Sequence, residues 1–414
     1  MQNKLISDAQ HGFLQRRSTL SQQVKLLNTL TKNYDHKSRL DMIYLDFSKA
    51  FDRVSHNKLV YILDHLKVNS KVITWITNYL SERSQRTVVD DCFSTSKPVN
   101  SGVPQGSVLG PLLFILFVED LLQKISTSCT STTVFGFADD IKLLGNNRNE
   151  LQDALNIIGN WTKDWQQLIQ PAKSEHITFN HNHNLSDQFK FNINGNNITK
   201  VHTVKDLGIL ISDNLKWTPY LNQIKSKASR LCCLILRSFK TNNLETYKTD
   251  YNTYIRPIME YNTSIWTPHL KSEIKLIESV QQKFTKSVCK KLNLSFNNYS
   301  ERLNIMGMES LECRRVRFDL ILLYKMYNNL IDVNLDNFFQ PGLVQNKYNL
   351  RRHKCTLVKP PIAKTATRYK FFTYRIINLW NKLPEEVVTS RSLNLFKFRL
   401  QQIDLMSMYE FALY

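Results

Sequence analysis

The sequence predicts an α+β fold in which an antiparallel sheet packs against helices, followed by a mostly helical C-terminal region. Two β-favouring apolar runs, 132–137 and 141–144, meet at an acidic Ala-Asp-Asp tip and predict a hairpin. An apolar strand over 40–47 leads into a helix-like run over 48–66, and helical periodicity starts again at Thr218. These observations place the sheet in the first half of the chain and helices in the second.

Three carboxylates fall at ends of these strands. Asp139 and Asp140 occupy the hairpin tip, and Asp46 ends the apolar strand. An acidic tip alone is more often ordinary turn chemistry than a metal site. Three carboxylates on two neighbouring strands, however, can hold two Mg²⁺ ions about 3.5–4 Å apart, as phosphoryl-transfer enzymes do.

A Gly- and Pro-rich stretch, 100–114, lies between the two acidic elements and leads into an apolar helix over 112–122. Glycines let the backbone approach a flat ligand closely, and Gln105 supplies the lone side-chain amide. Read by itself, the stretch is equally a structural turn.

Other elements follow from periodicity and turn chemistry. Ser18 or Thr19 caps a helix through Leu30, and Asn194-Gly195 marks a hairpin turn. The remaining expected elements are a helix over 72–80 with Trp75 and Tyr79 in the core, a hairpin pairing 87–89 with 94–99, a helix over 148–167, a strand over 176–179 and strand-like residues 204–211.

Together, Leu45 to Val54, Ser101 to Phe114 and Phe137-Ala138-Asp139-Asp140 resemble the palm of a reverse transcriptase from a non-LTR (LINE-type), jockey-like retrotransposon. The resemblance implies a right-hand polymerase with partial fingers and palm over 1–212, a helical thumb and connection over 213–300, and a basic C-terminal region over 301–414. Nothing before Ser7 resembles the preceding fingers segment of the family, so we expect an N-terminally truncated chain.

The resemblance also implies the site residues. Asp46, Asp139 and Asp140 are the catalytic carboxylates, and with Phe47 they are the metal positions for two Mg²⁺ ions, with Mn²⁺ as the alternative. The nucleotide-binding residues implied are Phe47, Phe51, Gln105, Gly106, Arg17 and Lys173. Phe51 would close off the sugar 2′ face or simply pack the core, Arg17 would contact phosphate or stay solvated beside the helix cap, and Lys173 would protonate pyrophosphate or be a solvated turn lysine.

Charge favours a polyanionic partner. The chain carries a net +20, of which +4 lies in residues 1–200 and +16 in 201–414. Residues 345–382 hold ten Lys or Arg and no acid, mixed with aromatics, a composition typical of single-stranded nucleic-acid binding. The alternative is that the aromatics pack a small C-terminal domain. The expected partners are an RNA template, a DNA primer and dNTPs, with no membrane; the pattern sets no oligomeric state.

Seven cysteines without a Cys-x-x-Cys pair or a secretory signal favour reduced thiols in the nucleus or cytoplasm over secretion. The sequence thus predicts an RNA-directed DNA polymerase. Two alternatives are a truncated remnant that only binds nucleic acid, and an RNA-dependent RNA polymerase, which Phe51 argues against.

Overall fold

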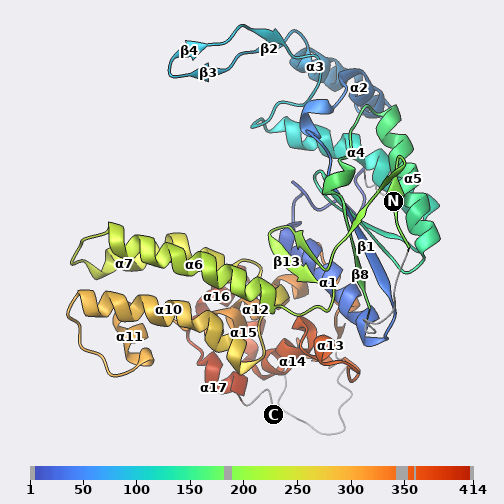
Figure 1. Cartoon of the computed structure of the whole chain (residues 1–414). Coiled ribbons are helices and arrows are strands. Elements are labelled where there is room, and N and C mark those ends of the chain that lie inside the picture. Colours follow the sequence, from blue (N-terminus) through green and yellow to red (C-terminus); the bar gives the residue numbers. More distant parts are fainter. Residues whose placement is uncertain (1–4, 181–188, 342–352, 359, 411–414) are drawn as a thin grey trace. The chain divides into compact units, whose positions relative to one another are not determined.

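The computed structural model describes residues 5–180, 189–341, 353–358 and 360–410 (Figure 1). The chain divides into two compact units: a first unit of residues 1–22 and 38–204, and a second unit of 23–37 and 205–414. Helix α1 (Thr19–Asp35) therefore begins in the first unit and continues in the second. Ser18 caps it, since its hydroxyl accepts a hydrogen bond from the Ser21 amide at 3.2 Å, as the sequence predicts.

Within the described residues, the first unit is built on a five-stranded sheet in the order β11-β8-β1-β7-β6. β1 is central and runs antiparallel to both β7 and β8, while β11 is parallel to β8. The predicted hairpin is β6 and β7. The strands are β1 (Leu40–Leu45), β6 (Thr133–Phe137), β7 (Asp140–Gly145), β8 (Glu175–Phe179) and β11 (Thr199–Lys200).

One face of the sheet is buried against helices. Ile43 and Leu45 of β1 and Leu143 of β7 form a core with Phe114 and Phe117 of α4. Fully burying each such side chain contributes roughly 1.5–3 kcal/mol, so this face holds the sheet and its helices together. The helices of this unit are α2 (His56–His65), α3 (Ser70–Leu80), α4 (Leu109–Ser128) and α5 (Arg148–Asp164), with short helices η1 (Phe51–Arg53) and η2 (Pro171–Lys173).

Two expectations for the helices of this unit are wrong. The helix-like run predicted from Ser48 is a turn followed by η1, and the α-helix starts only at His56. Trp75 is 56% exposed, so it is not a core residue; α3 buries Ile76 and Leu80 instead. Trp75 stacks on Tyr79 with ring centroids 6.0 Å apart, so each ring shields part of the other from solvent.

A hairpin does follow α3, but the predicted pairing of 87–89 with 94–99 is wrong, because the turn is tighter and the strands extend back to Ser84. β2 (Ser84–Gln85) pairs with β5 (Lys97–Pro98), and β3 (Val88–Val89) pairs with β4 (Cys92–Phe93). Asn194-Gly195 also forms the expected turn, between β9 (Asn192–Ile193) and β10 (Asn196–Asn197).

A buried ion cluster lies at the start of β1. Asp41 has no exposed side-chain area and accepts hydrogen bonds from Arg39, Arg148, His176 and Thr178 at 2.7–3.1 Å. Burial opposes ionisation of Asp41, but the bonds from His176 and Thr178 and the nearby positive charge outweigh it and lower the pKa of its carboxyl. The cluster is therefore satisfied within the protein.

The second unit is almost entirely helical among its described residues. A β12–β13 pair (Thr203–Asp206 and Ile209–Ser212) precedes the long helices α6 (Thr218–Ser238), α10 (Lys271–Lys291) and α12 (Leu311–Tyr327). The shorter elements are α7 (Leu244–Asp250), the π-helical turn η3 (Tyr251–Ile255), α8 (Arg256–Glu260), α9 (Thr263–Trp266), α11 (Tyr299–Met306), η4 (Leu335–Asn337), β14 (Gln340–Pro341), β15 (Leu357–Val358), α13 (Ala366–Tyr369), α14 (Phe372–Lys382), α15 (Glu385–Val388), α16 (Leu393–Gln401) and α17 (Leu405–Glu410).

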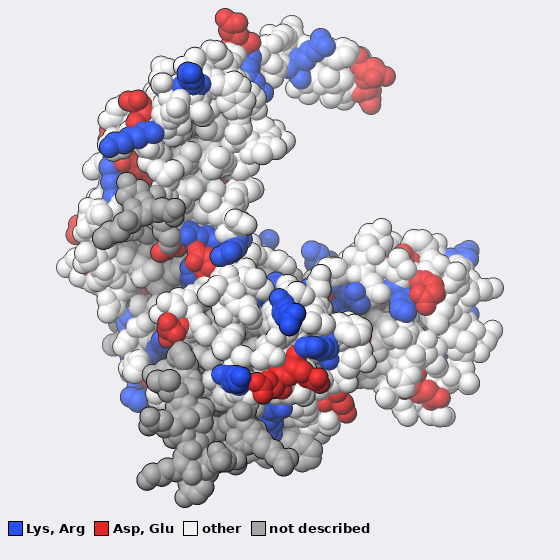
Figure 2. All heavy atoms as spheres, turned by 180° about the vertical axis from the view of Figure 1, so that it is seen from behind, with Lys and Arg blue, Asp and Glu red and all other residues white. Residues whose placement is uncertain are grey.

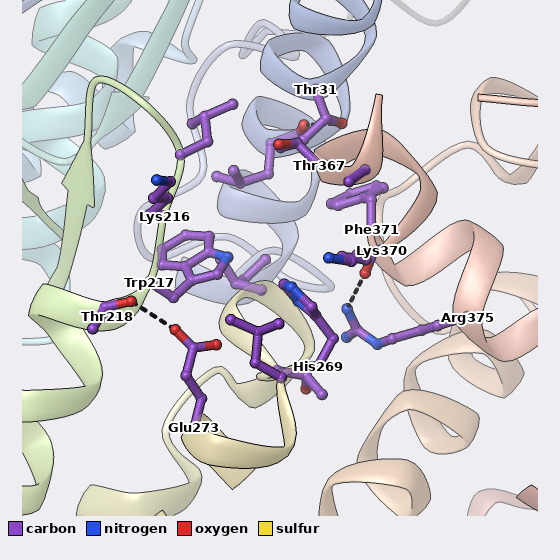
Figure 3. Close-up of a pocket in the computed structure, with 16 residues that line it drawn as sticks. Thr31, Lys216, Trp217, Thr218, His269, Glu273, Thr367, Lys370, Phe371 and Arg375 are labelled. Atoms are coloured by element: carbon purple, nitrogen blue, oxygen red, sulfur yellow. Dashed lines mark hydrogen bonds between the residues drawn. The ribbon is translucent and has the colours of Figure 1, made fainter. Parts of the chain in front are cut away.

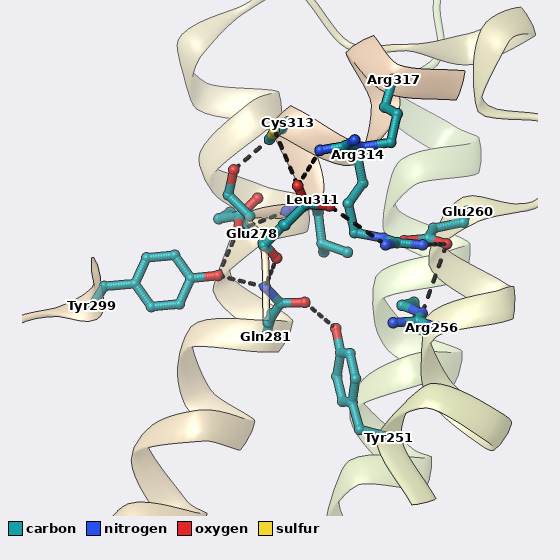
Figure 4. A network of polar contacts seen from close by, with 12 residues as sticks. Tyr251, Arg256, Glu260, Glu278, Gln281, Tyr299, Leu311, Cys313, Arg314 and Arg317 are labelled. Carbon is teal, nitrogen blue, oxygen red and sulfur yellow. Dashed lines mark hydrogen bonds and ion pairs between the residues drawn. The ribbon is translucent and has the colours of Figure 1, made fainter. Parts of the chain in front are cut away.

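Polar contacts join these helices in their interior (Figure 4). Gln281 of α10 accepts from the Tyr251 hydroxyl at 2.8 Å and donates to the Tyr299 hydroxyl and the Glu309 carbonyl, each at 2.9 Å. Arg314 of α12 makes a paired contact with the Glu260 carboxylate of α8. Because buried polar groups without partners are costly, these contacts favour the packing of α10 against η3 and α11, and of α12 against α8.

Four of the tail aromatics are packed in the fold, whereas Tyr369 is exposed. Phe371, Phe372, Tyr374 and Trp380 are buried. Arg368, also buried, donates to the Asn28 and Thr31 side chains of α1 within the same unit. The packing alternative therefore holds for these residues, whereas Lys347, Tyr348, Arg351, Arg352 and Lys359 lie outside the described ranges.

Three bulk features complete the fold. On the face drawn in Figure 2, Lys and Arg form separate small groups, several of them next to Asp or Glu. All seven cysteines lie in the described ranges and none is paired. In the part of the chain that the structure describes, every helix is too short or too polar to cross a bilayer.

Candidate active site

The β6–β7 hairpin presents two of the predicted carboxylates. Phe137 pairs with Asp140, which leaves Ala138 and Asp139 as the two-residue turn. Ala138 is in the left-handed region with φ of 55°, a conformation that costs a non-glycine residue about 1 kcal/mol or more. Asp139 is half-buried and Asp140 exposed. The predicted acidic tip is confirmed as a tight turn.

Asp46 directly follows β1, beside that hairpin. The β1–β7 register pairs Leu45 with Ile141, so continuing it by one residue places Asp46 next to Asp140. Side chains alternate along a strand, and Leu45 and Phe47 point into the helix-covered core; Asp46 therefore points to the opposite face.

The chain segment 168–174 holds Asp46 in place from the other side. The Gln170 amide donates to the Asp46 carbonyl at 2.9 Å, and the Ser48 amide donates to the Leu168 carbonyl at 2.7 Å. The same segment brings Lys173, whose Nζ lies 3.9 Å from Asp46 Oδ2. Lys173 and Asp46 are thus two predicted site residues that the fold brings together.

The charge of Asp46 acts on the Asp139 carboxyl. Burial raises the pKa of the Asp139 carboxyl, and the negative charge of Asp46 raises it further. Lys173 lies 3.9 Å from Asp46, but, in contrast to Asp41, no cationic side chain lowers the pKa of the Asp139 carboxyl. Two carboxylates placed together are therefore unfavourable unless a cation neutralises them.

The donor set fits a hard divalent cation, because carboxylate oxygens are the ligands that Mg²⁺ prefers. Asp46 and Asp139 supply the pair, and Asp140 lies beside Asp46 by register. No group of three or more His, Cys, Asp or Glu side chains is gathered closely enough to hold a metal ion among the described residues, so Asp140 is not drawn in with the other two. Phe47 is buried in the core, which leaves only its main chain for a metal.

The Gly- and Pro-rich stretch is pinned to the segment after Asp46. The Gly102 amide donates to the Val54 carbonyl at 2.8 Å, and the Val103 amide donates to the Phe51 carbonyl at 2.9 Å. Gly102 is required there, because a Cβ would lie 2.8 Å from the Asp52 backbone. Gln105 Nε2 in turn donates to Asp52 Oδ1 at 2.9 Å.

Phe51 and Gly106 occupy this same loop region. Phe51 is half-buried and stacks on Phe114 with centroids 4.3 Å apart, while Phe13 meets its edge at 6.4 Å. It therefore packs on the core and keeps part of its ring exposed. Gly106 has φ of 79° and open space where a Cβ would stand, so the backbone there is accessible.

Arg17 is engaged by its own segment. Its Nη1 donates to the carbonyls of Ser7 and Gln10 at 2.7 and 2.5 Å, and its Nη2 pairs with Asp8 at 3.0 Å. A phosphate contact would require some of these bonds to be exchanged, and that role stays a prediction.

Residues that are not among the predicted site residues surround the acidic turn. Gln10 and Gly12 contact Ala138, and Gln22 donates to the Gly136 carbonyl at 2.9 Å. Lys142 is buried behind the turn and donates to Gln22 Oε1 at 2.8 Å. A buried glutamine or lysine leaves no periodic signature, so only the spacing Gln-x-Gly-Phe near the start of the chain could have drawn attention to this segment.

A cavity of about 380 Å³ lies within the second unit (Figure 3). Trp217 and Phe371 line it, and its polar groups are bonded within the protein: Glu273 accepts from the Thr218 hydroxyl at 2.6 Å, and Arg375 pairs with Asp319. Desolvation and the charges of Lys370 and Arg375 lower the pKa of its His269 to about 4. None of its lining residues is among the predicted site residues.

A sheet that presents carboxylates at a hairpin turn and at the adjoining strand end, with helices on its other face, is the palm of a right-hand polymerase. The family model described as reverse transcriptase (RNA-dependent DNA polymerase) matches residues 1–211. The chain belongs to the reverse transcriptase family, in its non-LTR retrotransposon branch, which confirms the resemblance and the predicted fold class.

Curated relatives support the assignment to this family. The probable RNA-directed DNA polymerase from transposon BS of Drosophila melanogaster is 27% identical over 69% of this chain and 33% of its own length. The RNA-directed DNA polymerase from the mobile element jockey of the same fly is 26% identical over 68% of this chain and 32% of its own. The chain thus spans about a third of the length of these relatives.

Among solved structures, apo telomerase from Candida tropicalis matches 74% of this chain and 51% of that chain, with 11% identity and a TM-score of 0.42. A score of this size adds nothing to the family assignment. Members of the reverse transcriptase family generally use divalent metal ions, which agrees with the carboxylate pair.

Proposed function

We propose that this chain is an RNA-directed DNA polymerase that extends a DNA primer on an RNA template with dNTPs. The observation that carries the proposal is the placement of two carboxylates by neighbouring strands, Asp46 at the end of β1 and Asp139 in the β6–β7 turn, where burial and the charge of Asp46 raise the pKa of the Asp139 carboxyl. Such a pair has a physical reason to exist when it binds cations at a phosphoryl-transfer site.

Two Mg²⁺ ions, or Mn²⁺, held by Asp46, the Phe47 carbonyl, Asp139 and Asp140, would neutralise phosphate charge and make the primer hydroxyl a better nucleophile. The chain's own part is positioning. The sheet register fixes Asp46, and the hairpin turn fixes Asp139, so the two carboxylates need little reorganisation on binding.

The surrounding residues would select and orient the nucleotide. The exposed part of Phe51 would exclude a sugar 2′-hydroxyl, and Gln105 would offer its amide to a base or sugar after releasing Asp52. Gly106 leaves room for the nucleotide. Lys173, beside Asp46, would donate a proton to departing pyrophosphate, and Arg17 would contact phosphate.

Helix α6 supports the nucleic-acid part of the proposal. Lys225, Arg230 and Arg237 line a shallow depression along it with Ser226 and Ser229, and no acidic residue lines that depression. Cations and hydroxyls in a row suit phosphate oxygens. In this scheme residues 1–212 are partial fingers and palm, 213–300 the thumb and connection, and 301–414 the basic C-terminal region; the unpaired cysteines suit a nuclear or cytoplasmic site.

The test is primer extension on an RNA template with Mg²⁺ and dNTPs, comparing the wild type with Asp139→Asn. The matched control is Asp153→Asn, an exposed aspartate on α5 of the same unit. We expect extension by the wild type and the control, and none by Asp139→Asn, which should stay folded because the change relieves charge repulsion.

Extension at the wild-type rate by a folded Asp139→Asn would refute the site. Binding of primer–template without any dNTP incorporation by the wild type would favour a remnant that only binds nucleic acid. Preferential incorporation of rNTPs would instead identify an RNA-dependent RNA polymerase.

A further inference from the structure

Gln10 lies fully buried beside the acidic turn. Its Oε1 accepts hydrogen bonds from the Ala138 amide at 2.9 Å and from the Gly12 amide at 2.8 Å, and its Nε2 donates to the Ala138 carbonyl at 3.3 Å. One side-chain amide therefore satisfies both backbone polar groups of the residue that precedes Asp139. Because Ala138 is buried, losing Gln10 would leave both groups without a partner from this side chain.

Ala138 needs such a partner. Its left-handed conformation is disfavoured for alanine and persists only where the surroundings over-determine it. The Ala138 carbonyl belongs to the peptide group whose N–H is that of Asp139. A hydrogen bond that holds this carbonyl in place therefore fixes the plane of the Ala138–Asp139 peptide group, and with it the direction of the Asp139 side chain.

Backbone hydrogen bonds also hold the segment around Gln10 against the acidic turn. The His11 amide donates to the Gly136 carbonyl at 2.7 Å, and the Gly136 amide donates to the Ala9 carbonyl at 2.9 Å, so this segment runs parallel to the end of β6. Arg17 donates to the Gln10 carbonyl at 2.5 Å, which ties the segment to the start of α1. The segment around Gln10 is therefore attached both to β6 and to the start of α1.

We propose that Gln10 is a positioning residue that sets the placement of the Asp139 carboxylate relative to Asp46. This inference rests on the proposed function, but it concerns the geometry of the turn and can be tested without activity. Groups that orient a metal-binding carboxylate commonly change metal affinity or activity 10–100-fold when removed.

The main variant is Gln10→Ala, and the matched control is Gln281→Ala. Gln281 is also fully buried and also uses both ends of its amide, but within the second unit. The first readout is amide hydrogen exchange of the peptide spanning 134–140. We expect faster exchange there in Gln10→Ala and wild-type exchange there in Gln281→Ala.

The second readout is Mn²⁺ binding, measured by water-proton relaxation on the chain alone. Gln10→Ala should bind Mn²⁺ about 10–100-fold more weakly, whereas Gln281→Ala should bind as the wild type does. If primers are extended, kcat should fall by a similar factor with little change in KM for dNTP, because Gln10 contacts the turn and not the nucleotide.

Gln10→Glu separates positioning from simple packing. A protonated glutamic acid can still donate to the Ala138 carbonyl, but an ionised one cannot and repels it. Wild-type Mn²⁺ affinity should rise with pH as the carboxylate ligands lose their protons, and the affinity of this variant should rise less steeply because the ionised side chain introduced by Gln10→Glu no longer supports the turn.

Equal exchange and equal Mn²⁺ binding in Gln10→Ala and Gln281→Ala would overturn the inference. A wild type that binds Mn²⁺ but extends no primer would refute the proposed function alone, and the exchange and binding comparison would still decide the role of Gln10.

Discussion

Gly12→Ala should displace the acidic turn. A Cβ at this buried position would lie 2.5 Å from the Ala138 nitrogen, about 0.9 Å inside the 3.4 Å at which ordinary contact begins. The obstacle is backbone and cannot swing aside, so the turn or the Gln10 segment must move by a large part of that distance. Overpacking of this size costs about 1–3 kcal/mol of stability.

The functional consequence should exceed the loss of stability. A misplacement of roughly 1 Å at a catalytic group can lower the rate about 10²-fold. We expect primer extension by Gly12→Ala to fall by that order, measured as kcat on an RNA template below the unfolding temperature. Substrate KM should change much less, because the displaced group is the Asp139 carboxylate.

Gly159→Ala is the control. Its new Cβ would approach 2.8 Å from Asn194 Oδ1, the end of a side chain that can rotate away. It adds the same methyl group to a buried glycine of the same unit, and activity should stay at the wild-type level. Wild-type extension by a folded Gly12→Ala would show that the turn tolerates the shift and would refute the reasoning.

Three further predictions follow from other parts of the molecule. Asp41→Asn should lower the free energy of unfolding by about 1.5–3 kcal/mol in denaturant titrations, because the partly exposed Arg39 and Arg148 lose the charged partner of their hydrogen bonds; a loss below about 1 kcal/mol would contradict this. The pKa of the Asp41 carboxyl is lower in the folded chain than in the unfolded chain. Ionised Asp41 therefore adds to the free energy of unfolding above about pH 4, the ordinary aspartate range, and this contribution is lost as the pH falls through the lowered pKa. The stability of Asp41→Asn should accordingly depend less on pH in this acid range. Phe51→Ala should reduce the preference for dNTP over rNTP in single-nucleotide incorporation, and an unchanged preference would leave Phe51 a packing residue only. Replacing Lys225 and Arg237 together by alanine should reduce the slope of log affinity against log salt by about 2 in primer–template binding, and an unchanged slope would remove α6 from the interface.

The elements that carry local signals were predictable. Alternating apolar residues around an Ala-Asp-Asp tip gave the β6–β7 hairpin, and an apolar run ending in Asp46 gave β1. The order of the motifs also predicted that Asp46 and Asp139 share one site, because strands adjacent in a sheet place their ends together.

Features decided by tertiary packing were not predictable from local patterns. Trp75 is a large apolar residue, which favours a core position, yet α3 buries Ile76 and Leu80 and leaves Trp75 exposed. Phe371 and Trp380 lie among lysines in the sequence, yet they are buried within the second unit. Gln10 bonds to Ala138, 128 residues away, and no periodicity in a single sequence reports such a pairing.

The division of α1 between the two units has a consequence for synthesis. Residues 23–37 are synthesised more than 300 residues before these partners: the Thr365 amide donates to Asp35, and Arg368 donates to Asn28 and Thr31. At roughly 5–20 residues per second, the delay is on the order of tens of seconds. These contacts of the nascent helix cannot form earlier, so the second unit closes only after residues 365–368 have been synthesised.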